Sequence, residues 1–118
     1  MNRRRLGVAG EEAVARHYLD AGYVVVDRNW RCREGELDLV LTIGDTLVFC
    51  EVKTRSNTAF GAPFEAVTVT KQRRLRTLAL RWLADHPEHR SGSLRFDVAS
   101  VLTAPATGPA IEVIEHAF

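Results

Sequence analysis

The sequence lacks several features that would assign it at once to a particular class of protein. No run of apolar residues approaches the roughly 20 that cross a bilayer, and the basic start, MNRRRLG, is not followed by the apolar stretch of a secretory signal. The two cysteines, Cys32 and Cys50, lack a metal-type spacing, and no thiolate or imidazole cluster suits zinc. These absences favour a cytoplasmic protein with reduced, buried thiols and no membrane or zinc site.

Length and composition then bound the fold. A chain of 118 residues is the size of one domain, and a content of 46% hydrophobic and 26% charged residues is typical of a globular protein. The sequence shows no internal repeat, low-complexity tract or linker. We therefore expect a single domain over residues 1–118.

The net charge of +1 says little about partners, but the charges are unevenly distributed. Basic residues gather between Lys71 and Arg95 and again at Arg28, Arg31 and Arg33, whereas acidic residues gather near the middle of the chain. A basic rim around an acidic centre suits a polyanion held near bound cations. On charge alone, an ordinary solvated helix face is the simpler explanation of the arginine-rich segment.

Hydrophobic periodicity predicts the order helix, strand, strand, strand, helix, strand, with one further edge strand at the end. The predicted helices cover residues 7–21 and a segment from the N-cap Thr70 to just before Pro87, and the predicted strands cover 23–30, 37–43, 46–53, 94–102 and 111–114. Loops are expected over 31–36, 56–63 and 104–109. A three-stranded meander that crosses through a helix to a parallel fourth strand gives an α/β fold, a mixed sheet with flanking helices.

The hairpin at the centre of the chain, GELDLVLTIGDTLVFCEVKTR, carries charged side chains in its most hydrophobic part. Counting outward from the predicted Gly44-Asp45 turn places Asp38 opposite Glu51. Because alternate residues of a strand share a face, Glu51 and Lys53 should project side by side. Two neighbouring carboxylates repel each other unless a positive charge lies between them.

Glu11 lies at the centre of the apolar stripe of the first predicted helix, whereas Glu12 lies at its edge. A carboxylate in that position must be paired, neutralised or bound to a cation. Asp38, Glu51 and Glu11 together offer the oxygen ligands that Mg²⁺ or Mn²⁺ takes in proteins. Lys53 could then orient a water or stabilise charge developing on a phosphate. The set predicts a phosphodiester hydrolase, while a salt bridge at a sheet end is the alternative for these residues taken singly.

Four blocks of the sequence, in this order, resemble a known family. They are GVAGEEAVARHYLDAGY, RNWRCREGELDLV, LVFCEVKTR and RFDV. Together they resemble the YraN-like family of small bacterial proteins, which is related to archaeal Holliday-junction resolvases in the PD-(D/E)XK, or restriction-endonuclease-like, nuclease superfamily. The resemblance covers about residues 6–102 and implies the restriction-endonuclease-like fold.

The resemblance also implies a role for each matched residue. Asp38 would be the first metal carboxylate of the superfamily motif and Glu51 the second, with Lys53 as the motif's lysine. Glu11 would be the helix-borne glutamate of the resolvase-like branch, and this agrees with its place on the apolar stripe.

On these grounds we expect an endonuclease that acts on DNA, branched or single-stranded, with Mg²⁺ or Mn²⁺; the resolvase relatives imply a homodimer. The basic residues expected to contact phosphates are Arg31, Arg33, Arg55, Lys71, Arg73 and Arg74. Two alternatives stay open, a nucleic-acid-binding module that keeps the fold but cuts nothing, and a protein-interaction domain. Asp97 of RFDV has no role that the resemblance assigns, and we interpret it as a buried structural partner of Arg95 or of a neighbouring residue.

Overall fold

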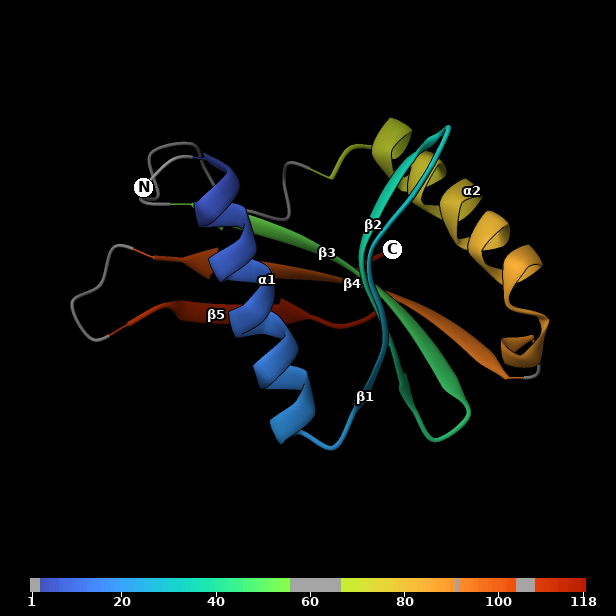
Figure 1. Ribbon diagram of the computed structural model, residues 1–118, viewed down its shortest axis with the longest axis horizontal. Helices are drawn as coiled ribbons and strands as arrows, with labels where there is room; N and C mark the ends of the chain where they lie inside the picture. Colours follow the sequence, from blue (N-terminus) through green and yellow to red (C-terminus); the bar gives the residue numbers. More distant parts are fainter. Residues whose placement is uncertain (1–2, 56–66, 91, 104–107) are drawn as a thin grey trace.

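The hydrophobic segments of the chain form one five-stranded β-sheet with a helix on each face (Figure 1). The computed structural model describes residues 3–55, 67–90, 92–103 and 108–118. The elements in chain order are α1 (Arg3–Asp20), β1 (Val24–Cys32), β2 (Gly35–Ile43), β3 (Thr46–Arg55), α2 (Val69–Asp85), the 3-10 helix η2 (Pro87–His89), β4 (Ser93–Leu102) and β5 (Ala110–Ile114). Within the described residues, no helix has the length and apolar character to cross a membrane.

The strands lie side by side in the order of the sequence. β1, β2 and β3 form an antiparallel meander, α2 crosses from β3 to the parallel β4, and β5 returns antiparallel to β4. This arrangement confirms the α/β fold and the mixed sheet predicted from the sequence. The hairpin register also follows the count from the Gly44-Asp45 turn, because Ile43 pairs with Thr46 and Leu39 with Cys50.

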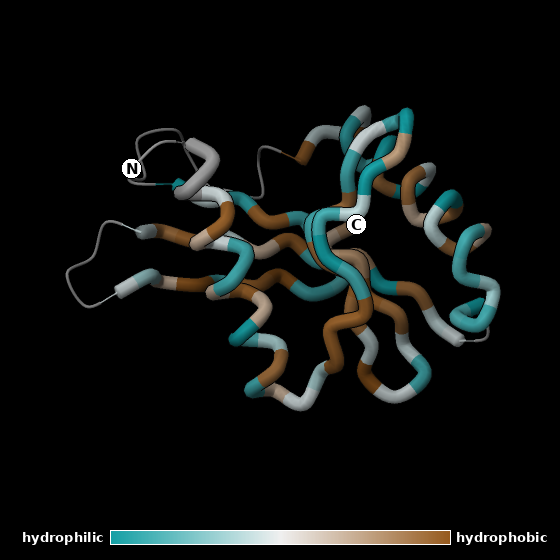
Figure 2. Tube along the Cα trace, in the orientation of Figure 1, coloured by the Kyte–Doolittle hydropathy of each residue, from teal (hydrophilic) through white to brown (hydrophobic). Residues whose placement is uncertain are grey.

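The sheet separates two apolar clusters, which appear as brown segments along the strands in Figure 2. One cluster lies under α1 and the other under α2. Along β3, Leu47 and Phe49 belong to the α2 side, while Val48 and Cys50 belong to the α1 side. The same alternation turns Glu51 toward the α2 side of the sheet, beyond the apolar part of the strand.

The helices differ from the predicted ones at their ends and in their buried stripe. The N-cap of α2 is Thr68, whose hydroxyl accepts a hydrogen bond from the backbone N–H of Lys71, so the predicted cap Thr70 lies inside the helix. α1 begins at Arg3 and not at residue 7, because a helix tolerates an internal glycine. Val8 and Leu19, predicted on the buried stripe of α1, are 55% and 45% exposed, because this helix contacts the sheet along a narrower face.

The predicted loop over residues 31–36 is mostly strand. β1 continues to Cys32 and β2 begins at Gly35, so that only Arg33 and Glu34 form the turn. The prediction was wrong because this hairpin is largely solvent-accessible, and its strands therefore carry polar side chains. The predicted loop at 56–63 and residues 104–107 of the last predicted loop lie outside the described residues.

The two cysteines are both free, but they differ in burial. Cys50 is buried on the α1 side of the sheet, as expected. Cys32 is only partly buried, and its thiol donates a hydrogen bond to Glu34 Oε2 over 3.2 Å. The expectation of two buried thiols is therefore correct for one of them, because the second lies in the accessible β1–β2 hairpin.

Candidate functional site

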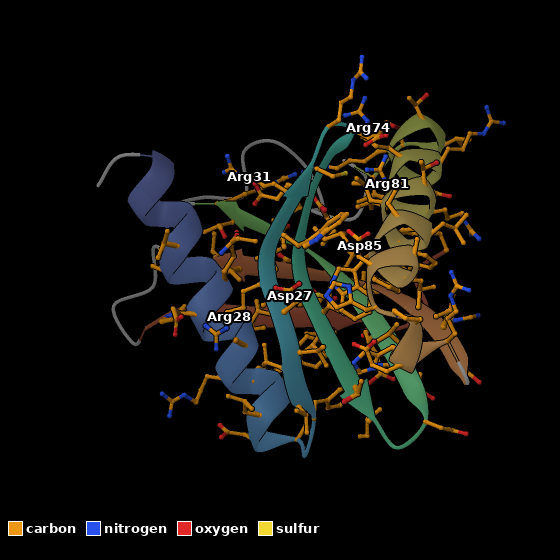
Figure 3. The ribbon with its side chains drawn as sticks, turned by 45° about the vertical axis from the view of Figure 1, so that its right-hand side comes forward. Asp27, Arg28, Arg31, Arg74, Arg81 and Asp85 are labelled. Carbon is orange, nitrogen blue, oxygen red and sulfur yellow. The ribbon has the colours of Figure 1, made fainter. Side chains whose placement is uncertain are left out.

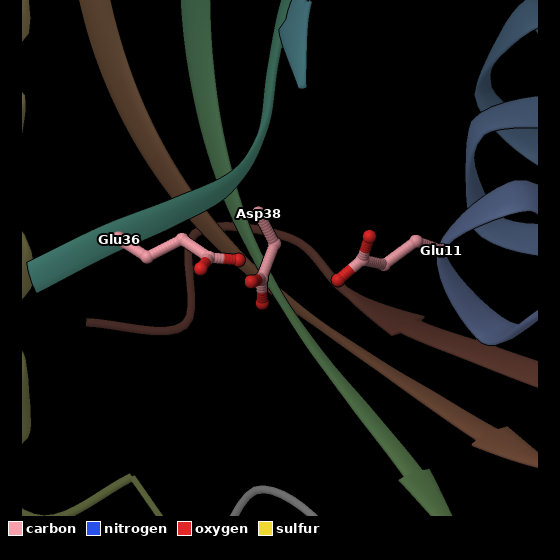
Figure 4. A group of neighbouring side chains, drawn as sticks. All are labelled: Glu11, Glu36 and Asp38. Atoms are coloured by element: carbon pink, nitrogen blue, oxygen red, sulfur yellow. The ribbon is translucent and has the colours of Figure 1, made fainter. Parts of the chain in front are cut away.

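Three carboxylates from two elements converge at one end of the sheet. Glu11 of α1 and Glu36 and Asp38 of β2 each place an oxygen within 4.8 Å of the others. Figure 4 shows Asp38 between the other two side chains, with Glu36 approaching from β2 and Glu11 from the helix. Among the described residues, this group has the spacing of ligands that could share one metal ion.

Asp38 lies where β2 parts from β3. The last pair between these strands is Leu39 with Cys50, although β2 stays paired with β1 as far as Gly35. The backbone N–H of Val52, beyond that last pair, donates to Asp38 Oδ2 over 2.8 Å. The carboxylate therefore satisfies a strand amide that β2 no longer reaches, and this hydrogen bond fixes its position.

Glu11 reaches the group because α1 approaches β3 closely at Gly10. A Cβ on Gly10 would lie 1.9 Å from Thr54 Oγ1, so any side chain there would push the helix away from the strand. At Gly7, the other glycine of the GxxGE segment, no described atom outside the helix's own backbone lies within 4 Å of such a Cβ. Of the two glycines, Gly10 is the one that the position of Glu11 requires.

Mutual repulsion and burial change the proton affinity of these acids. Burial, followed by the charge of Glu51, raises the pKa of Asp38 to about 7. Burial likewise raises the pKa of Glu11; the charges of Glu36 and Glu51 add to this, while a hydrogen bond from Asn29 works against it. A cation bound among these carboxyls would act against both shifts, because a nearby positive charge favours the ionised form of a carboxyl.

Glu51 projects from β3 and contacts two lysines. Lys71 Nζ, from the first turn of α2, lies 2.9 Å from Glu51 Oε1, and Lys53 Nζ lies 3.5 Å from the same oxygen. These are the only two lysines in the sequence, which otherwise uses arginine as its strongly basic residue. The chain therefore places both of its compact ammonium groups at one carboxylate.

The pKa values of the two lysines are shifted in opposite directions. Burial lowers the pKa of Lys53, and the neighbouring Lys71 lowers it further. Burial also disfavours the charged form of Lys71. The contacts that Lys71 makes with Lys53 and Glu51 outweigh burial, so the pKa of Lys71 is raised. Of the two lysines, the one on α2 therefore holds its proton more tightly.

The structure brings the predicted Glu11 and Asp38 together and adds Glu36, which the sequence-based interpretation missed because it lay in a predicted loop. Glu36 is two residues before Asp38, and alternate residues of a strand share a face. Both side chains would therefore have been predicted on one face if the segment had been recognised as a strand. Glu51 lies close enough to raise the pKa of Asp38, but its carboxylate is engaged by lysines. Its metal-ligand role, and the catalytic role of Lys53, stay predictions.

The residues predicted to contact phosphates lie on the β1–β2 hairpin, on α2 and at the end of β3. The Arg31 side chain is 78% exposed and pairs with Glu36 over 2.7 Å, and Arg33 is exposed in the hairpin turn. Arg73 and Arg74 are exposed on α2, and Figure 3 shows Arg74 beside the end of the hairpin. Arg55 is partly buried, and its carbonyl accepts a hydrogen bond from the Thr103 N–H.

Asp97 holds the C-terminal part of the chain in place. It is 1% exposed and accepts hydrogen bonds from Tyr18 Oη at 2.8 Å, Arg95 Nε at 2.9 Å and the His116 N–H at 3.0 Å. These contacts confirm the interpretation of Asp97 as a buried partner of Arg95. They join α1, β4 and the segment after β5. None of the three converging carboxylates takes part in these hydrogen bonds.

Comparison with known proteins gives the family. The model of the uncharacterised protein family UPF0102 matches residues 10–101. A UPF0102 protein of Frankia casuarinae is 56% identical over 114 residues, which cover 96% of this chain and 95% of the relative. UPF0102 proteins of Rhodococcus jostii and Clavibacter michiganensis are each 50% identical, over 96% and 95% of this chain and 95% and 94% of their own. In agreement with the YraN-like sequence blocks, the chain belongs to the uncharacterised protein family UPF0102.

Proposed function

We propose that this protein is a metal-dependent nuclease that hydrolyses phosphodiester bonds in DNA. The observation that carries the proposal is the convergence of three carboxylates from α1 and β2 beside a glutamate held by two lysines. The resemblance to the PD-(D/E)XK superfamily supports the reaction class. The residues that match its motif, Asp38, Glu51 and Lys53, lie at the same end of the β2–β3 hairpin.

The donor set fits a hard divalent cation. Carboxylate oxygens are the ligands that Mg²⁺ and Mn²⁺ prefer, and no described histidine or cysteine belongs to the group. Ligand oxygens at about 2.1 Å from Mg²⁺ lie roughly 3–4 Å apart. The oxygens of Glu11, Glu36 and Asp38 lie within 4.8 Å of one another, so small side-chain rotations would bring them to that spacing.

The proposed reaction divides between the cation and the residues around it. When bound, Mg²⁺ or Mn²⁺ supplies Lewis-acid polarisation of a phosphoryl oxygen and lowers the pKa of water. Glu11, Glu36 and Asp38 would hold the cation at the end of the sheet. The oxygen of the attacking water forms a bond to phosphorus as the bond from phosphorus to the leaving sugar oxygen breaks.

The lysines would handle the protons of this reaction. Lys53 Nζ, whose pKa is lowered by burial and by Lys71, is suited to accept a proton from the attacking water. Lys71 Nζ, whose pKa is raised, is suited to donate a hydrogen bond or a proton to the leaving oxygen. Neighbouring groups whose pKa values are pushed apart are a common arrangement for paired acid and base roles.

The exposed arginines would orient the DNA backbone. Arg33 is exposed on the hairpin turn, and Arg73 and Arg74 are exposed on α2. Figure 3 shows Arg74 beside the end of that hairpin. Arginine side chains on a surface attract phosphates without reading sequence. A module that only binds nucleic acid gains nothing from three close carboxylates, because without a cation they repel phosphate.

The test is an incubation of the purified protein with labelled single-stranded, duplex and four-way-junction DNA, and with single-stranded RNA. Each substrate is tested with Mg²⁺, with Mn²⁺ and with EDTA. We expect cleavage of DNA with either metal and none with EDTA. DNA retention without cleavage in any metal would favour the binding module, and RNA-only cleavage would correct the substrate.

Variants locate the activity on the chain. Asp38→Asn, Glu36→Gln and Lys53→Ala should each lose cleavage by about a hundredfold or more, because each removes a group from the proposed centre. Glu112→Gln, an exposed carboxylate on the edge strand β5, is the matched control and should cleave like the unmodified chain. Cleavage that persists in Asp38→Asn and Lys53→Ala would place the activity elsewhere or in a contaminant.

A further inference from the structure

Asn29 of β1 has a backbone conformation that is unusual for a strand. Its φ is 51°, and Asn29 and His116 are the non-glycine residues of the described part of the chain with positive φ. The left-handed region is unfavourable for a residue with a Cβ, although asparagine tolerates it better than most. Such a conformation persists where the surrounding structure requires it, and it clusters at functional sites.

This distortion lies across from Asp38. The β1–β2 pairs on either side are Arg28 with Leu39 and Trp30 with Leu37, and the register between them sets Asn29 opposite Asp38. At the same point β2 parts from β3, because its last pair with β3 is formed by Leu39. The irregular residue of β1 and the departure of β2 from β3 therefore coincide at the three carboxylates.

The side chain of Asn29 lies near Glu11 and favours its ionised carboxylate, which lowers the pKa of Glu11 as an amide donor does. An ionised carboxylate only accepts hydrogen bonds, so the amide NH₂ of Asn29 is the donor. The preceding residue, Arg28, forms a salt bridge with Glu12. Two successive residues of β1 thus contact two successive glutamates of α1, which fastens the helix to the strand beside the site.

We propose that Asn29 is a positioning residue for Glu11. Its left-handed backbone directs an amide donor to the Glu11 carboxylate and holds that carboxylate toward Asp38 and Glu36, where the three take a divalent cation. The inference rests on the proposed function, since it concerns the same centre. Groups that orient a metal ligand without touching the metal commonly set its affinity.

The choice of residue supports a role for the side chain. Glycine would adopt a φ of 51° without the steric penalty of a Cβ. The chain instead carries asparagine at this exposed position, with a hydrogen-bonding side chain that reaches the helix. The backbone conformation alone does not require an amide, whereas the contact with Glu11 does.

The experiment is a thermodynamic cycle on Mn²⁺ affinity, measured by calorimetry on the whole chain. Asn29→Gly keeps the backbone conformation and removes the amide, and Glu11→Gln removes the charge that the amide positions. We expect Asn29→Gly to bind Mn²⁺ about tenfold more weakly than the unmodified chain. In the Glu11→Gln background, the same change should weaken binding no further, because its effect passes through Glu11.

A matched control separates the amide from the backbone. His116→Gly makes the same kind of change at the other non-glycine residue of positive φ, which lies beside Asp97 and not at the carboxylates. It should leave Mn²⁺ affinity unchanged. An equal loss of affinity in His116→Gly and Asn29→Gly would assign the effect to general loosening of the fold and overturn the proposal.

A metal-free crystal structure of Asn29→Gly gives a readout that does not depend on the nuclease proposal. Glu11 should rotate away from Asp38 or occupy more than one conformer. Mn²⁺ binding by the unmodified chain together with an unchanged Glu11 and unchanged affinity in Asn29→Gly would overturn the role of Asn29 alone. Absence of Mn²⁺ binding by the unmodified chain would overturn the metal centre itself, and with it the inference.

Discussion

Lys71 on the crossover helix lies closer to Glu51 than Lys53 does, although Lys53 stands only two residues beyond Glu51 on the same strand. The Nζ to Oε1 distances are 2.9 Å and 3.5 Å. The contact ties the first turn of α2 to the end of β3, two elements joined by the parallel crossover of the fold. Any chemistry at Glu51 is therefore coupled to the position of α2.

The first prediction concerns the identity of this second lysine. Lys71→Arg keeps the positive charge but replaces a compact ammonium with a larger planar group, so it should lower the single-turnover rate of DNA cleavage by about tenfold or more. DNA affinity should change little, because the charge is retained. Cleavage and binding are measured on the same labelled substrate.

Arg90→Lys is the control for this exchange. Arg90 is exposed after the 3-10 helix η2, so swapping the two basic residue types there should leave the cleavage rate unchanged. If Lys71→Arg cleaves DNA as fast as the unmodified chain, the charge of Lys71 matters and its shape does not. The proposed proton-donor role of Lys71 would then be wrong.

The second prediction is a stability that falls as pH rises in metal-free protein. The pKa of Asp38 is raised to about 7 in the folded state from an ordinary 3.8. Between about pH 4 and pH 7, the folded state therefore keeps a proton that the unfolded state has lost, and the free energy of unfolding decreases with pH. The loss should approach roughly 2–4 kcal/mol above pH 7.

Urea unfolding in EDTA at pH 5 and pH 8 measures this dependence. Asp38→Asn keeps a carbonyl that can accept the Val52 N–H and removes the titrating group, so its stability should change less between the two pH values. Asp45→Asn, in the exposed hairpin turn, should retain the full dependence. Parallel pH profiles for Asp38→Asn and the unmodified chain would show that Asp38 does not ionise in this range.

A third prediction concerns Glu36, the acidic residue that the sequence-based interpretation left out. At pH 8, saturating Mn²⁺ should stabilise the folded chain, by about 2.7 kcal/mol at a metal concentration one hundred times its Kd. Glu36→Gln should reduce this gain by a measurable fraction, because it removes one of three oxygen ligands. Thermal unfolding with and without Mn²⁺ gives the difference.

Asp20→Asn serves as the comparison on α1, since Asp20 is exposed at the end of the helix and lies outside the converging group. It should keep the full stabilisation by Mn²⁺. A gain in Glu36→Gln that equals that of the unmodified chain would limit the centre to Glu11 and Asp38, with Glu51 as the remaining candidate for a third ligand.

The sequence predicted the parts of the site that follow from hydrophobic periodicity and from turn-forming residues. The two-residue turn at Gly44-Asp45 determines the β2–β3 register, and helical periodicity identified Glu11 on the buried side of α1. Asp38 and Glu11 could therefore be selected without coordinates. Their meeting depends on the close approach at Gly10, which is a tertiary contact.

The other participants depend on geometry that no local pattern encodes. Glu36 joins the site because β2 continues past its last pair with β3, and a polar strand in an accessible hairpin resembles a loop in sequence. The positive φ of Asn29 breaks strand geometry at a single residue. The contact between Lys71 and Glu51 depends on how α2 returns across the sheet, and the scarcity of lysine in the sequence was the available signal for it.

The last prediction compares the two glycines of α1. Gly10→Ala would place a methyl group against Thr54, whose Oγ1, Cβ and Cγ2 atoms all lie within 3.0 Å of the new carbon, so rotation of the threonine cannot relieve the contact. The helix should move away from β3, at a cost of about 1–3 kcal/mol in unfolding free energy. Mn²⁺ affinity should fall as well, because Glu11 moves with the helix.

Gly7→Ala adds the same methyl group one turn earlier, where no atom of the described residues outside the helix backbone lies within 4 Å. It should stabilise the chain by about 0.5–1 kcal/mol through helix propensity and leave Mn²⁺ affinity unchanged. Thr54→Ala combined with Gly10→Ala should recover part of both losses by vacating the space. If Gly10→Ala destabilises the chain but binds Mn²⁺ normally, the close packing of α1 on β3 serves the fold alone, and Glu11 does not need it to reach the metal.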